Sequence, residues 1–152
     1  MQGQELLTSF IEVGIGIAGF SSVIAAISRE RLTENMRLAF MQLWLQSAAL
    51  IIFCSIPLLA NSAGLDDQTA YIIGSYFYTA WISGVILFSP LRVRFKTNPV
   101  MMFGISFPFI GLFNAVYLQT AWLYLLLILL GITVAFRTFY ELLRDMWALN
   151  NE

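Results

Sequence analysis

The chain has 152 residues, of which 59% are hydrophobic and 11% are charged, whereas an average soluble domain is about 25% charged. That composition excludes an ordinary soluble fold, because one water-facing globule cannot hide so much apolar surface. The expected partner is therefore the lipid bilayer. Nucleic acid is not expected as a partner, because the net charge is −1 and the chain has no basic tail or basic face.

Five segments are apolar and long enough to cross the hydrocarbon core as helix, which takes about 20 residues. The sequence predicts one all-α transmembrane domain over 1–152, with a cytosolic tail at 144–152 and helices at about 5–27, 38–60, 69–89, 100–118 and 121–143. The last two are separated at 114–120, where polar residues interrupt an uncharged apolar run. A fourth segment that is kinked at Pro108 or re-entrant is the alternative.

The basic residues determine the expected orientation, because cytoplasmic loops collect Lys and Arg. All eight fall on one side of the five-helix threading: Arg29, Arg31, Arg37, Arg92, Arg94, Lys96, Arg137 and Arg144. This bias predicts that the N-terminus is outside and the C-terminus inside. The first span lacks the basic segment and the cleavage site of a signal peptide, so we expect it to remain as an anchor.

The first predicted helix carries one acidic residue inside its apolar run, Glu12. At 100° per residue, polar and small residues share a face with it: Glu5, Thr8, Ser9, Gly16, Gly19, Val23 and Ala26. Gly16, Gly19 and Ala26 on this face are expected to let another helix approach closely. Two interpretations of Glu12 remain open. It is either a titratable or cation-attracting carboxylate that lines a cavity, or a carboxylate near the outer interface that reaches water or caps a neighbouring helix.

The other predicted spans also carry polar residues. Gln42 and Gln46 lie one turn apart in the second span, Ser75 and Thr79 one turn apart in the third, and Asn114 near the outer end of the fourth. Hydrogen bonds across helix interfaces are one explanation for them. A polar pathway that they form together with Glu12 is the other.

Several kinds of chemistry are not expected. The chain has no histidine and one cysteine, Cys54, in an apolar run, which indicates a small core or lipid-facing residue. Asp66 and Asp67 form a short acidic pair without further ligands, which favours loop solvation over a metal site. Gly14, Gly16 and Gly19 match a dinucleotide-binding pattern but lie in mid-span and follow no strand. We therefore expect that the protein is not an enzyme and that it binds neither a cofactor nor a metal.

The C-terminal tail is expected to continue the last helix. Three- and four-residue spacings allow mutual pairing on one cytosolic face among Arg137, Glu141, Arg144 and Asp145. Trp147 is expected to anchor the tail at the headgroups. Docking of a cytosolic protein partner on the Arg-rich loops or the tail is the alternative.

The stretch 16–26 resembles the first helix of a set of small bacterial multispanning proteins of unknown function. The shared features are an Ala-Gly-Phe-small-small motif at 18–22, an Arg-rich first loop, a proline that ends the second helix (Pro57), and an aromatic-Arg pair at 136–137. The resemblance implies a multi-pass protein of the bacterial inner membrane. Small multidrug exporters also place one Glu in their first helix, but their other motifs and their four-helix plan are absent.

The sequence thus predicts a self-associating protein that conducts or transports a small ion or solute. Five short helices enclose too little volume for a pore of their own, so Glu12 and the small face of the first helix are expected at a subunit seam or pathway. A non-conducting anchor, assembly or effector subunit of a larger complex is the alternative function.

Overall fold

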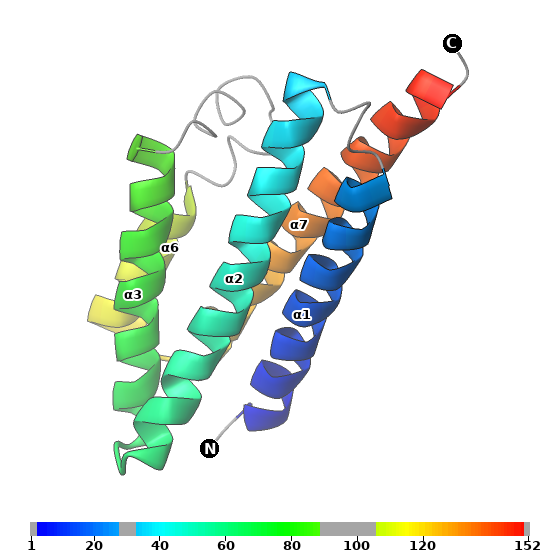
Figure 1. The fold of residues 1–152 in the computed structure, drawn as a ribbon. Helices are drawn as coiled ribbons and strands as arrows, with labels where there is room; N and C mark the ends of the chain where they lie inside the picture. The colour runs from blue at the N-terminus through cyan, green and yellow to red at the C-terminus, as the bar shows by residue number, and fades with distance from the viewer. Residues whose placement is uncertain (1–2, 28–32, 89–105, 151–152) are drawn as a thin grey trace.

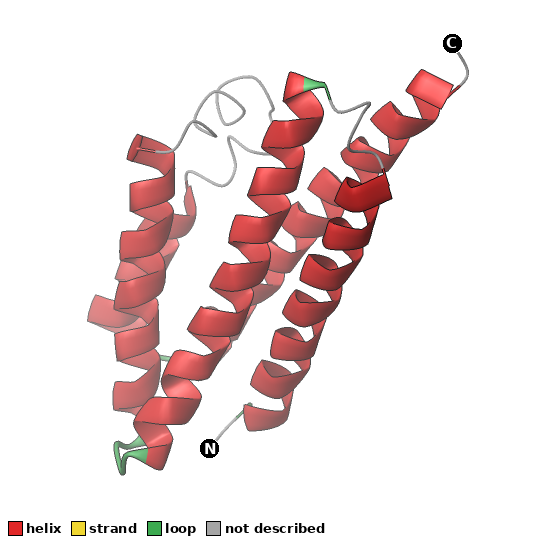
Figure 2. Cartoon of the chain, viewed as in Figure 1, coloured by secondary structure: helices red, strands yellow, loops and turns green. Residues whose placement is uncertain are grey.

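The computed structural model describes residues 3–27, 33–88 and 106–150, and all regular structure in these ranges is helical (Figure 2). The elements are α1 (Gln4–Ile27), α2 (Glu34–Ser62), α3 (Asp67–Phe88), α6 (Phe107–Phe113), a π-helical turn η3 (Asn114–Leu118) and α7 (Ala121–Asn150). The predicted all-α fold with five helical segments is confirmed, and the tail continues the last helix as expected.

Four of these helices, α1, α2, α3 and α7, are long and apolar enough to cross a membrane. The fifth segment, α6 with η3, is a shorter apolar helix from Phe107 to Leu118. A helix of that length rises about 18 Å, whereas the hydrocarbon core is about 30 Å thick. The first part of the predicted fourth span, 100–105, lies outside the described residues. Pro108 lies in the first turn of α6, where a helix tolerates proline without a kink.

Helix α2 is at the centre of the bundle and packs against α1, α3 and α7, while α6 packs mainly against α3 (Figure 1). Successive helices run in opposite directions, so the start of α1, the α2–α3 turn and the start of α7 share one end. A hydrogen bond of 2.7 Å from Gln68 Nε2 to Gln119 Oε1 joins α3 to the link before α7 at this end. We call it the N-terminal end. Arg37, Arg137 and Arg144 belong to helix segments that lie toward the opposite end.

The core consists of two clusters of buried apolar side chains. The larger joins all five helical segments around Phe53, Tyr78 and Tyr124. The smaller includes Leu43 from α2 and Leu142 from α7. Cys54 is fully buried in the larger cluster, which confirms its interpretation as a small core residue.

Pro57 does not end the second helix, contrary to what the resemblance implies, because α2 continues to Ser62, close to the predicted bound of 60. A proline inside a helix leaves the carbonyl four residues earlier without its N–H partner. Here that carbonyl belongs to Phe53, and the Tyr124 hydroxyl donates a hydrogen bond to it across 2.5 Å. A side chain of α7 thus satisfies the carbonyl that the proline frees, and the helix continues.

The predicted reversal at 114–120 is confirmed, and Asn114 holds it. The Asn114 Oδ1 accepts a hydrogen bond from Thr120 N at 3.1 Å, and its Nδ2 donates to Thr120 O at 3.2 Å. Gln119 between them adopts a left-handed conformation with φ 52°. This residue turns the chain from η3 into α7 over two residues.

Candidate functional site

The polar face predicted on α1 lies at the surface of the chain. Every member of that face is exposed: Glu5, Thr8, Ser9, Glu12, Gly16, Gly19, Val23 and Ala26. The opposite side of α1 carries buried residues at Leu7, Gly14, Ser21 and Ile24, and packs on α2. The orientation follows from the helical period, because residues seven apart return to the same side after two turns.

The glycines of α1 divide between these two sides. A Cβ on Gly14 would lie 3.1 Å from Leu50 Cβ and 3.2 Å from Ile51 Cγ1, so Gly14 carries the close contact between α1 and α2. A Cβ on Gly16 or Gly19 would meet no described atom within 4 Å. Gly16 and Gly19 therefore leave room for a helix that does not belong to the described part of this chain.

Glu12 lies about 12 Å along α1 from Gln4, at 1.5 Å per residue. It is exposed, and within the described residues its carboxylate forms neither a salt bridge nor a hydrogen bond. In a bilayer an exposed carboxylate at this depth would contact hydrocarbon, which costs on the order of several kcal/mol. Its position is therefore favourable only where water or a second protein surface meets the carboxylate.

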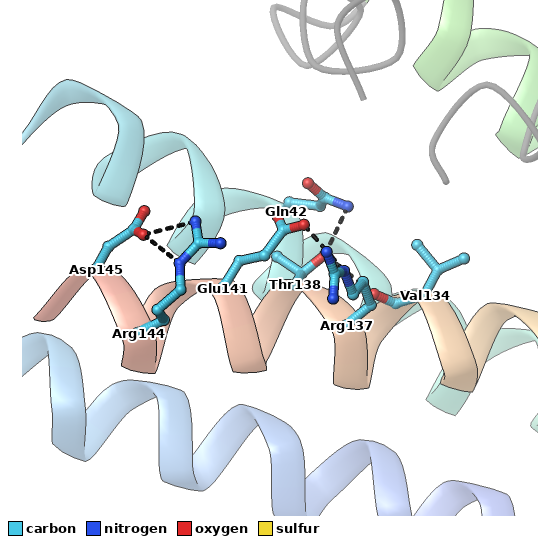
Figure 3. Close-up of polar contacts among 7 residues, drawn as sticks. All are labelled: Gln42, Val134, Arg137, Thr138, Glu141, Arg144 and Asp145. Atoms are coloured by element: carbon cyan, nitrogen blue, oxygen red, sulfur yellow. Dashed lines mark hydrogen bonds and ion pairs between the residues drawn. The ribbon is translucent and has the colours of Figure 1, made fainter. Parts of the chain in front are cut away.

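Gln42 lies on the inner side of α2 and joins that helix to α7. It is buried, and its Nε2 donates to Thr138 Oγ1 at 3.0 Å (Figure 3). The Thr138 hydroxyl in turn donates to the Val134 carbonyl at 3.0 Å. The pair is a cross-link between two helices. The sequence did not single out Thr138, although it shares a helix face with the apolar Ala135 and Leu142.

Ser75 and Asn114 meet between α3 and η3. Both are buried, and Asn114 Nδ2 donates to Ser75 Oγ at 3.0 Å. The Asn114 amide also closes the reversal before α7, so each of its polar atoms has a partner. The structure gives these two residues a part in helix packing and turn formation.

Unlike the three residues above, Gln46 and Thr79 form no hydrogen bond to another helix within the described residues. The Gln46 Oε1 and the Thr79 Oγ1 are buried and accept no hydrogen bond. Gln46 lines a cavity of about 60 Å³ between α2, α3, α6 and α7, together with Phe53, Tyr78 and Phe107. A volume of that size is enough for about two water molecules. Thr79 lies against the backbone of α6 at Gly111, where a Cβ would overlap its hydroxyl.

The six predicted pathway residues are therefore distributed over separate places. No hydrogen bond among the described residues joins Glu12 to the other five. Ser75 and Asn114 are in contact, Gln42 pairs with Thr138, and Gln46 borders the cavity. Among these six residues, the Gln46 and Thr79 oxygens lack a partner inside the described bundle, and the Glu12 carboxylate lacks one on the exposed face of α1.

The charged residues of the tail form two ion pairs. Arg137 Nε donates to Glu141 Oε1 at 3.1 Å, as predicted, whereas Arg144 Nη2 donates to its neighbour Asp145 Oδ1 at 3.0 Å (Figure 3). Trp147, close to the end of α7, is 74% exposed. The side chains of Arg137, Arg144 and Asp145 are exposed, whereas that of Glu141 is mostly buried.

The acidic pair at the N-terminal end has a structural part in the α2–α3 turn. Asp66 accepts hydrogen bonds from Thr69 N at 3.0 Å and Thr69 Oγ1 at 2.7 Å, and thus caps α3. Asp67 accepts one from Asn61 Nδ2 at 2.9 Å. Within the described ranges, no three His, Cys, Asp or Glu side chains are grouped so that they could hold a metal ion.

Comparisons of the chain with known protein families, curated proteins and solved structures found no significant match. The resemblance of its first helix to small bacterial multispanning proteins therefore stays a prediction. Function has to be argued from the arrangement of the residues themselves.

Proposed function

We propose that this chain is a multi-pass protein of the bacterial inner membrane that self-associates through the polar face of α1 and conducts or transports a small cation. The observation that carries the proposal is the outward placement of Glu12 with the whole polar and small face of α1. In lipid, such a face is stable only when it meets water or another protein surface.

The interior of the bundle favours a pathway between copies over a pathway through one copy. The described core is filled by large apolar side chains, and the cavity beside Gln46 is about 60 Å³. Copies that bring their α1 helices together around an axis would place a ring of Glu12 carboxylates and Ser9 hydroxyls along it. Rings of carboxylates are a usual way in which channels select cations.

The charge at the N-terminal end agrees with cation entry. Glu5, Glu12, Asp66 and Asp67 belong to this end, and the basic residues Arg37, Arg137 and Arg144 of the described part lie toward the other. By the positive-inside rule the N-terminal end faces outward. A cation approaching from outside would meet carboxylates first.

Flux through reconstituted vesicles tests the proposal. Purified protein in liposomes is expected to carry K⁺ or H⁺ down a gradient, and Glu12→Gln is expected to lower that flux by about tenfold or more. Glu34→Gln removes an exposed carboxylate at the start of α2 and serves as the matched control, with flux unchanged. Flux no higher than in empty vesicles, or equal flux in the Glu12→Gln protein, would contradict the proposal.

A second function, a non-conducting subunit of a larger complex, is favoured by the exposed end of α7. Trp147 is 74% exposed on a helix that continues to Asn150. As an anchor or assembly subunit, the chain would co-purify with a cytosolic protein in fixed ratio, and Trp147→Ser would release that protein. Conductance by the isolated chain would argue against this function.

A further inference from the structure

A cleft between α1 and α7 opens at the N-terminal end of the bundle. Its volume is about 800 Å³, and its lining includes Gln4, Glu5, Leu6 and Thr8 from α1 and Trp122 and Leu125 from α7. Binding sites for small molecules commonly have volumes of about 300 to 1,000 Å³. We call this space the outer cleft.

Gly3 packs closely against α7 and α3 at the base of the outer cleft. Gly3 has φ +75°, and a Cβ there would lie 2.9 Å from Leu125 Cδ1 and 3.4 Å from Tyr71 Oη. Glycine at this position thus lies directly against Leu125 of α7 and Tyr71 of α3. Leu7, one turn beyond Gln4, is fully buried and holds the first turns of α1 in place. The start of α1 and the start of α7 are therefore in close contact at the base of the cleft.

The lining combines one negative charge with one large aromatic face. Glu5 is exposed and carries the only charge among the described residues that line the cleft. Trp122 is 68% exposed, so its indole is available to a ligand. The Thr8 hydroxyl donates to the Gln4 carbonyl at 3.1 Å and can still accept a hydrogen bond. Leu6 and Leu125 add apolar surface.

This lining suits an organic cation. A carboxylate attracts an ammonium group, and the face of tryptophan binds ammonium and alkylammonium groups more strongly than other aromatic rings do. Ca²⁺ and Mg²⁺ need six or more oxygen ligands, and a single carboxylate supplies too few. We propose that the outer cleft binds an organic ammonium group, either from the headgroup of an outer-leaflet lipid or from a free amine.

The position of the cleft agrees with either source. It lies at the start of both α1 and α7, where a membrane that the helices cross would have its headgroups (Figure 1). Glu5 also lies in the first turn of α1, where a carboxylate stabilises a helix whether or not a ligand is bound. The test must therefore measure binding and not stability. Glu5 and Thr8 of the cleft also belong to the polar face of α1, but the proposal does not require transport, and a binding measurement can fail or succeed separately from the flux measurement proposed above.

Fluorine NMR of the whole chain labelled with 5-fluorotryptophan tests it. The four tryptophans give four resonances, and Trp122→Leu assigns the one from the cleft. In nanodiscs of phosphatidylglycerol, which has no amine, we expect a saturable shift of the Trp122 resonance on addition of ethanolamine or choline, or on replacement of part of the lipid by phosphatidylethanolamine. A shift with the lipid alone identifies a headgroup as the source, and a shift with the dissolved amine identifies a free ligand.

Variants distinguish binding in the outer cleft from a general effect of negative charge at this end of the protein. Glu5→Gln is expected to weaken the binding at least about tenfold. Asp67→Asn removes a carboxylate at the same end that does not line the cleft, and should leave the binding unchanged. The Trp147 resonance, from the opposite end, should not move. The proposal is overturned if no amine shifts the Trp122 resonance saturably, or if Asp67→Asn weakens the binding as much as Glu5→Gln.

Discussion

The Tyr124 hydroxyl donates to the Phe53 carbonyl across 2.5 Å, and Phe53 is the residue whose carbonyl Pro57 leaves without a helical partner. Both groups are buried. A carbonyl freed inside a membrane has no water to accept from, so it is expensive unless another donor reaches it. The side chain of α7 thereby makes the proline compatible with a continuous α2.

This relationship predicts the effect of removing the hydroxyl. Tyr124→Phe should lower the free energy of unfolding by about 1 to 2 kcal/mol, because it leaves the Phe53 carbonyl unsatisfied. In a Pro57→Ala background the residue at 57 supplies its own N–H, so the same change should cost less. Unfolding in mixtures of mild detergent and SDS measures all four proteins of this cycle. Equal losses in both backgrounds would show that the hydroxyl and the proline are not coupled.

Two glycines of α3 form a matched pair. A Cβ on Gly74 would lie 2.9 Å from Tyr124 Cζ, whereas one on Gly84 would meet no described atom within 4 Å. Gly74→Ala should therefore destabilise the fold by about 1 to 3 kcal/mol, through crowding of a buried ring. Gly84→Ala should stabilise it by up to about 1 kcal/mol, since alanine is the better helix former. The melting temperatures of the two variants should move in opposite directions, and a fall in both would contradict this explanation.

The two glutamines of α2 should respond differently to replacement by an apolar residue. Gln42→Met removes the hydrogen bond to Thr138 and is expected to cost about 1 kcal/mol. Gln46→Met removes a buried oxygen without a hydrogen bond and fills part of the cavity, so it should be neutral or stabilising. The same unfolding measurement compares the two. A large loss at Gln46 would mean that ordered water already satisfies its amide.

Asp66 should make stability depend on pH in the acidic range. Hydrogen bonds from the Thr69 hydroxyl and backbone N–H lower the pKa of the Asp66 carboxyl below its ordinary value of 3.8. A lowered pKa means that the ionised group contributes fully above the ordinary value and that its contribution is lost as the pH falls through the lowered one. Asp66→Asn should keep the cap but remove this part of the pH dependence. Unfolding curves between neutral and acidic pH that coincide for the two proteins would be the contrary result.

The sequence was a good guide to the helices because apolar length alone defines a membrane-crossing segment. The long helices and the reversal at 114–120 were found where expected, since only polar residues could interrupt that apolar run. The way in which α2 accommodates Pro57 was not predictable, because the Tyr124 hydroxyl that satisfies the freed carbonyl comes from α7, far along the chain. The pairing of Gln42 with Thr138 was missed for the same reason.

The face of α1 was also only half predictable. The helical period placed Glu12, Gly16 and Gly19 together, and the structure keeps them together. Sequence alone could not indicate that Gly14 rather than Gly16 packs against α2, because both sides of this helix carry small and apolar residues. Burial decides between them, and it leaves the polar side at the surface.

Cysteine cross-linking tests most directly whether the polar face of α1 is a subunit interface. In a Cys54→Ala background, which removes the single native cysteine, Ser9→Cys lies on that face, and Ile52→Cys lies on an exposed part of α2 (49% exposed). A disulfide requires the two Cα atoms to come within about 7 Å. We expect mild oxidation in membranes to link Ser9→Cys chains into dimers and to leave Ile52→Cys chains monomeric. Unlinked Ser9→Cys chains, or linkage through Ile52→Cys instead, would contradict the account.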